Sequence, residues 1–97
     1  MLTQILYALS DEVRLSIVRQ LDEDGPATCG VFEVDRPKSS LSHHFRVLRE
    51  SGIVATTRQG TALLNALRRK DLDARFPNLL DAVLERPAST ARKRMRT

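Results

Sequence analysis

The sequence predicts a fold that is mainly α with a small β-hairpin. Three observations support this prediction. Apolar residues recur at helical spacing over most of the chain, their period changes to alternation over residues 53–67, and Gly60 lies within that alternating stretch. Apolar residues make up 41% of the 97 residues and charged residues 29%, which suits one small globular domain and is too apolar for a disordered chain. We therefore expect a single domain over residues 1–86.

The first two expected helices occupy residues 2–24. Four apolar residues of the first helix follow the spacing i, i+3, i+4, i+7: Leu2, Ile5, Leu6 and Leu9. Ser10 is expected to cap the second helix, and Gly25-Pro26 predict its end. The second helix carries its apolar stripe on Val13, Ile17, Val18 and Leu21. Residues 26–36 fit either a short helical turn or a structured loop.

A third helix is expected over residues 37–51. Pro37 suits a first helical position, and Gly52 lies where a left-handed C-terminal cap is expected. Its apolar stripe consists of Leu41, Phe45 and Leu48, with His44 at the edge. The opposite face carries polar residues at i, i+3, i+4, i+7 and i+10: Ser39, Ser42, His43, Arg46 and Arg49. Taken alone, such a stripe is more often only a solvated helix face.

This polar stripe also suits a helix that enters the major groove of DNA. Short donors and acceptors near the helix N-terminus can reach base edges, and arginines farther along can reach phosphates. Lys38 and Ser40 lie beside the same helix end, which itself favours a phosphate. We expect these residues to bind double-stranded DNA, with His43 toward the DNA and His44 packed inside.

Residues 53–67 predict a two-stranded hairpin that turns at Gln59-Gly60. With Arg58, its tip would offer a long cation, an amide and a residue that permits close backbone approach. A basic hairpin tip beside a groove-binding helix is the winged helix-turn-helix arrangement, in which the tip reaches the flanking minor groove or its phosphates. Because this combination is uncommon outside nucleic-acid binding, it favours DNA binding over a merely solvated face.

The last helical stripe lies between residues 69 and 84. Its apolar members are Leu72, Phe76, Leu79, Leu80, Val83 and Leu84. Pro77 interrupts the stripe and predicts either a kink or two consecutive short helices, the second starting at Pro77. Residues 87–97 have almost no apolar content and are expected to form a disordered basic tail.

The charge is unevenly distributed along the chain. Lysine and arginine number 16 against 12 acidic residues, a net charge of +4. Residues 1–35 hold two basic and seven acidic residues, a net charge of −5, so the remainder carries +9. This asymmetry favours a nucleic-acid partner more strongly than the total does.

Several classes of protein are disfavoured. The chain has no apolar run near the roughly 20 residues of a membrane helix and no signal-peptide pattern, so we expect a cytoplasmic protein without a membrane partner. Cys29 is the single cysteine and is expected to be a small buried residue rather than a redox sensor. No third group is evident to orient a nucleophilic Cys-His pair, so we expect no enzyme and no cofactor. The adjacent histidines point about 100° apart on a helix and are not expected to bind one metal ion.

Two segments resemble the ArsR-type (arsenical-resistance repressor) regulators. Residues 8–18, ALSDEVRLSIV, are similar to the opening motif of these proteins, and residues 40–54, SLSHHFRVLRESGIV, are similar to their recognition helix. The hairpin with Arg58 and Gly60 resembles their wing, and the whole similarity spans roughly residues 3–84.

The resemblance implies a winged-helix homodimer that represses transcription from a palindromic operator and is released by an inducer, which the sequence does not identify. It also implies a dimer interface built from the first and last helices, and a core this small is expected to have difficulty burying both stripes. The residues expected at this interface are Leu2, Ile5, Leu6, Leu9, Leu72, Phe76, Leu79, Leu80 and Val83. The alternative is a winged-helix protein-interaction module that does not bind DNA.

The sequence departs from the family pattern in three ways. The Cys-x-Cys pair of many metal-sensing members is absent, because Cys29 is followed by Gly30 and Val31. Asp71, Asp73 and Asp81 near the last helix have no histidine beside them, so we expect no metal site there either. Gly30 and residues 35–37 also indicate that the helix before the recognition helix is short or irregular.

Overall fold

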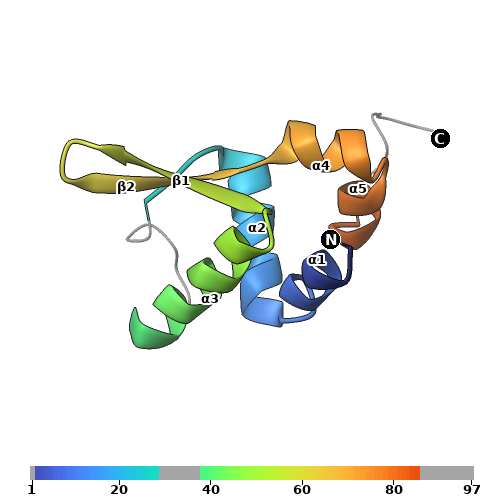
Figure 1. The fold of residues 1–97 in the computed structure, drawn as a ribbon, viewed down its shortest axis with the longest axis horizontal. Coiled ribbons are helices and arrows are strands. Elements are labelled where there is room, and N and C mark those ends of the chain that lie inside the picture. The colour runs from blue at the N-terminus through green and yellow to red at the C-terminus, as the bar shows by residue number, and fades with distance from the viewer. Residues whose placement is uncertain (1, 29–37, 86–97) are drawn as a thin grey trace.

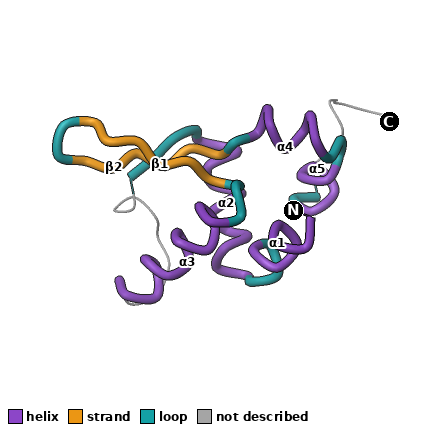
Figure 2. The backbone as a smooth tube through the Cα atoms, in the orientation of Figure 1, coloured by secondary structure: helices purple, strands orange, loops and turns teal. Residues whose placement is uncertain are grey.

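The computed structural model describes residues 2–28 and 38–85 and confirms a mainly α-helical fold with one small β-hairpin (Figure 1). Its elements are α1 (Leu2–Ala8), α2 (Glu12–Asp24), α3 (Lys38–Glu50), β1 (Val54–Gln59), β2 (Ala62–Leu67), α4 (Arg69–Arg75) and α5 (Leu79–Val83). Along the long axis, α1 and α5 lie toward one end, whereas the hairpin tip and the first turn of α3 lie toward the other (Figure 2). The predictions for Cys29, Pro37 and residues 87–97 fall outside the described residues.

The N-cap of α2 is Asp11 rather than the expected Ser10. Asp11 has an extended backbone, and its side chain accepts a hydrogen bond of 3.0 Å from the backbone N–H of Arg14. The Ser10 hydroxyl donates instead to the Tyr7 carbonyl, at 2.6 Å, where α1 ends. The predicted end of α2 is confirmed, because Gly25 adopts φ +86° and its N–H donates to the Leu21 carbonyl.

The helix α3 is anchored by the predicted apolar stripe and by the predicted glycine cap. Phe45 and Leu48 are fully buried, and Leu41 packs against the same core. At the C-terminus, Gly52 has φ +83° and donates to the Arg49 carbonyl, while Ile53 donates to the Leu48 carbonyl, both at 3.1 Å. This pair of bonds is the Schellman motif, which turns the chain directly from α3 into β1.

The hairpin has the predicted strands, and its turn is shifted by one residue from the expected Gln59-Gly60. Gln59 pairs with Ala62, so Gly60 and Thr61 form a two-residue turn, with φ +63° at Gly60. Thr61 was expected to begin the second strand and lies in the turn instead.

The base of the hairpin is fixed to the segment that follows α2. Asn65 is 1% exposed and exchanges both backbone hydrogen bonds with Ala27, at 2.8 and 2.9 Å. Its side-chain amide donates to the Ala27 carbonyl and accepts from the Thr56 hydroxyl. Residues 26–36 were expected to form a helical turn or a loop. Within this segment, Ala27 forms an isolated antiparallel β-bridge with Asn65 of β2.

The C-terminal helical segment is divided into two short helices, as one of the two alternatives predicted. The second helix starts at Leu79 rather than Pro77, after Asn78 in a left-handed conformation with φ +69°. Arg69 joins α4 to its neighbours, because its guanidinium bonds Asp22 of α2 at 3.0 Å, Asp73 at 2.9 Å and Asp81 of α5. Burial lowers the pKa of Arg69, but the bonds to Asp81 and Asp73 and the charge of Asp22 raise it by more than burial lowers it. The net pKa lies above its ordinary value, so Arg69 stays charged.

One subunit was expected to have difficulty burying the apolar stripes of both its first and its last helical segments. For four of the nine residues expected at the dimer interface, this expectation is wrong. Ile5, Leu9, Leu72 and Leu80 are at most 5% exposed within the single chain. Phe76, Leu79 and Val83 are partly buried against the same core. Leu2 and Leu6 remain exposed, at 43% and 46%.

Candidate nucleic-acid interface

The exposed face of α3 carries four of the predicted DNA-binding residues. These are Ser42, His43, Arg46 and Arg49, all of which are exposed while Phe45 and Leu48 fill the core on the opposite face. Ser40 is partly buried, and Lys38 and Ser39 lie in the first turn of α3, with side chains outside the described part of the structure. The helix therefore presents short polar groups nearer its N-terminus and cations farther along.

The hairpin tip carries the other three predicted residues. Arg58, Gln59 and Gly60 are all exposed at the end of β1 and in the turn. Arg58 pairs across the hairpin with Leu63, which is 50% exposed and was not predicted as a site residue. Paired residues of an antiparallel ladder point to the same side, so the tip offers a cation and an apolar side chain together.

Among the described residues, no ion pair holds Arg46, Arg49 or Arg58. Other basic residues are already paired, because Arg68 bonds Asp71 and Arg69 bonds three carboxylates. Much of the positive charge of residues 61–75 is thus neutralised within the chain. The cations on α3 and the hairpin tip stay available for an anionic partner.

A buried arginine joins the middle of α3 to α1 and α2. Arg14 is 5% exposed, and its Nε donates to the Ala8 carbonyl at 2.7 Å and its Nη2 to the Tyr7 carbonyl at 3.3 Å. Its Nη1 lies 3.0 Å from His44 Nδ1. Because a guanidinium can only donate, His44 Nδ1 must be the acceptor, which defines the tautomer of this histidine.

The two adjacent histidines therefore have different surroundings, as expected. His43 is exposed, whereas the side chain of His44 is 14% exposed and lies 3.8 Å from the Asp11 carboxylate as well as against Arg14. Burial raises the pKa of Asp11, but the backbone N–H and the positive charge of Arg14 lower it, and the net pKa lies below its ordinary value. The role of Arg14 was missed from the sequence, although it lies within residues 8–18, the segment that carries the family resemblance.

A family model described as a helix-turn-helix domain matches residues 9–57. The chain is 35% identical over 83 residues to the uncharacterized HTH-type transcriptional regulator YceK of Bacillus subtilis (strain 168), an alignment that covers 82% of this chain and 83% of YceK. Among solved structures, an ArsR family transcriptional regulator superposes with a TM-score of 0.69 and 28% identity, over 84% of this chain and 90% of that one. The chain belongs to the ArsR-type helix-turn-helix transcriptional regulators.

A second solved structure supports the same conclusion for this ArsR-type regulator. The transcriptional repressor BigR from Xylella fastidiosa superposes with a TM-score of 0.62 and 32% identity, over 77% of the regulator and 85% of BigR. The predicted family and fold are thereby confirmed, and the family is one of transcriptional regulators rather than of enzymes.

Within residues 2–28 and 38–85 of the regulator, no group of three or more His, Cys, Asp or Glu side chains could hold a metal ion. The three aspartates considered from the sequence are instead in ion pairs, Asp71 with Arg68, and Asp73 and Asp81 with Arg69. None of the described helices has the length and apolar character needed to cross a bilayer.

Proposed function

We propose that this regulator represses transcription by binding a palindromic operator as a homodimer. The observation that carries the proposal is the exposed face of α3, where Ser42 and His43 precede two arginines that form no ion pair within the described part of the chain. The other face of this helix is buried in the core. The likeness to BigR, which is described as a transcriptional repressor, favours repression. We propose residues 1–86 as the one domain that binds DNA and dimerises, and residues 87–97 as a basic tail.

Each residue of the interface has a proposed role. Ser42 and His43, with Lys38, Ser39 and Ser40 at the start of α3, would contact base edges or the phosphate at the helix N-terminus. Arg46 and Arg49 would contact phosphates, with Arg46 able to reach a base. The exposed hairpin tip, composed of Arg58, Gln59 and Gly60, would contact the flanking minor groove.

The exposed apolar residues of α1 are the proposed centre of the dimer interface. Leu2 and Leu6 expose 43% and 46% of their surface, which a two-fold partner would cover. Phe76, Leu79 and Val83 would extend the contact. The buried residues Ile5, Leu9, Leu72 and Leu80 would pack under this surface without touching the partner. A symmetric pair would place two recognition helices about 34 Å apart, one turn of DNA.

Salt titration of duplex binding tests the proposed interface. Binding of a random 20-base-pair duplex should fall steeply with salt, and Arg46→Ala or Arg58→Ala should each reduce the slope of log K against log salt by about 1. Arg75→Ala, which removes an exposed arginine of α4, is the matched control and should leave the slope unchanged. If the two interface variants titrate like wild type, the assignment is wrong. If wild type binds no duplex at all, the protein-interaction alternative is favoured.

A further inference from the structure

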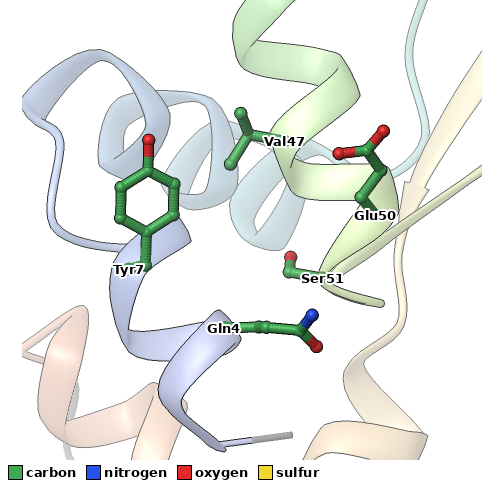
Figure 3. Close-up of a pocket in the computed structure, with 5 residues that line it drawn as sticks. All are labelled: Gln4, Tyr7, Val47, Glu50 and Ser51. Carbon is green, nitrogen blue, oxygen red and sulfur yellow. The ribbon is translucent and has the colours of Figure 1, made fainter.

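A cleft of about 160 Å³ lies between α1 and the C-terminal end of α3 (Figure 3). Gln4 and Tyr7 line it from α1, and Val47, Glu50 and Ser51 line it from α3 and the turn that follows. In Figure 3 the Val47 side chain points toward Tyr7, and the Gln4 side chain extends toward Ser51. The cleft is separate from the exposed Ser42 and His43, which lie nearer the other end of α3.

The lining combines hydrogen-bond acceptors with an aromatic ring. Glu50 is exposed, and among the described residues no ion pair holds its carboxylate. The Ser51 hydroxyl donates to the Leu48 carbonyl, so its remaining free sites are acceptors. Tyr7 is 60% exposed and offers open ring surface, to which cations are attracted. This set favours a ligand that carries a positive charge and N–H donors on a small apolar body.

The cleft lies on a different flank of α1 from the proposed dimer contact. At 100° per residue, the mean direction of Leu2 and Leu6 is roughly 150° from that of Gln4 and Tyr7. A partner that covers Leu2 and Leu6 would therefore leave the cleft open.

Tyr7 connects the cleft to the contacts that seat the recognition helix. The Arg14 guanidinium carbon lies 5.2 Å from the centre of the Tyr7 ring, and Arg14 also donates to the Tyr7 carbonyl. The same guanidinium bonds His44 on α3. A cation that binds at the Tyr7 ring would compete with Arg14 for that ring and would weaken the contacts through which Arg14 joins α1 to α3.

We infer that this cleft is an effector site for a small organic ammonium ion, which weakens DNA binding by moving α3 relative to α1. The inference rests on the proposed function, because it identifies the chemistry of the signal that releases the operator. A cavity of about 150 Å³ holds one benzene, so a ligand of about eight non-hydrogen atoms fits the volume of about 160 Å³.

Benzylammonium chloride is the probe, and benzyl alcohol, which is neutral and nearly isosteric, is its control. Titrated into the isotopically labelled full chain without DNA, benzylammonium should shift the amide resonances of Gln4, Tyr7 and Glu50 with a Kd on the order of 1 mM. It should also shift the imidazole nitrogens of His44 and not those of His43. Benzyl alcohol should bind at least fivefold more weakly.

Glu50→Gln removes the charge that selects the ligand and keeps the shape of the side chain. It should weaken benzylammonium binding about five- to tenfold and leave benzyl alcohol binding unchanged. Glu12→Gln, which neutralises an exposed glutamate of α2, is the matched control and should bind benzylammonium like wild type. Equal binding of the two probes, or equal binding by Glu50→Gln and wild type, would overturn the ligand assignment.

The effect on DNA is measured separately. With 10 mM benzylammonium chloride, the Kd of wild type for a random duplex should rise at least threefold relative to 10 mM sodium chloride. It should rise less for Glu50→Gln, because a five- to tenfold weaker site is only about half to two-thirds filled at that concentration. Probe binding with an unchanged duplex Kd would overturn the coupling to DNA. Absence of any duplex binding by wild type would instead contradict the proposed function, and the titration without DNA would still decide whether the site exists.

Discussion

Replacing Arg14 by methionine should strongly destabilise the fold. Arg14 is 5% exposed and donates to the Ala8 carbonyl and His44 at 2.7 and 3.0 Å, and to the Tyr7 carbonyl at 3.3 Å. Methionine keeps much of the apolar stem and removes all three donors, so the buried Ala8 carbonyl and His44 lose the Arg14 donor, while the Tyr7 carbonyl keeps its bonds from Ser10. Such losses cost about 1–3 kcal/mol each, and removing one member of a buried charged network costs about 3–5 kcal/mol in total.

Urea unfolding followed by circular dichroism measures this loss. A domain of this size is stable by about 5–15 kcal/mol, with a slope of about 1.5 kcal/mol per molar urea. A loss of about 3–5 kcal/mol therefore lowers the midpoint by roughly 2–3 M. Arg14→Lys keeps the charge without the planar fork and should lose less.

The control is Arg19→Met on the same helix. Among the described residues Arg19 forms no ion pair, so this variant should lose less than about 1 kcal/mol in free energy of unfolding. If the free energy of unfolding of Arg14→Met lies within about 1 kcal/mol of the wild-type value, the proposed importance of this network is refuted.

Three further predictions concern single residues. Because the folded-state pKa of Asp11 lies below its ordinary value of 3.8, its stabilising effect is present above that pH and is lost as the pH falls through the folded pKa. Asp11→Asn should thus be less stable than wild type at pH 7, and the difference in urea midpoint should shrink toward pH 2; a constant difference would contradict this. Gly52→Ala forces a side chain to φ +83° and should cost about 1 kcal/mol, seen as a fall of about 4–8 °C in thermal midpoint, whereas an unchanged midpoint would show that the cap is not strained. Leu6→Asp should weaken self-association at least tenfold in sedimentation equilibrium, while Gln4→Asp, on the opposite side of α1, does not, and equal effects would exclude this face of α1.

Local sequence signals predicted the elements that surround the proposed DNA-binding surface. The stripe of Leu41, Phe45 and Leu48 located α3, since its spacing leaves one helix face apolar. Gly52 and Gly60 marked the two turns correctly because each requires a positive φ, which glycine adopts most readily.

Contacts between distant segments could not be predicted in this way. Arg14 lies on the buried face of α2, at i to the i+3, i+4 and i+7 of Ile17, Val18 and Leu21, but an arginine carries no apolar signal. Its hydrogen bonds to carbonyls of α1 and to His44, which is 30 residues away, could not be read from that spacing. The pairing of Ala27 with Asn65 joins residues 38 positions apart. Asn65 lies in the predicted hairpin, but the sequence around Ala27 carries no strand pattern that would predict its pairing partner. The burial of Ile5 and Leu80 likewise depended on how α1 and α5 pack, which periodicity does not determine.

Selection of bound duplexes from a random pool tests most directly whether the regulator contacts bases as a symmetric pair. A homodimer that inserts α3 into successive major grooves should enrich a palindrome whose half-sites are about one helical turn, or about 34 Å, apart. The same selection with His43→Ala should yield a less specific palindrome, because a base-edge contact contributes about 1–3 kcal/mol. Enrichment of no sequence, or of one asymmetric site, would contradict a dimer that recognises its operator through α3.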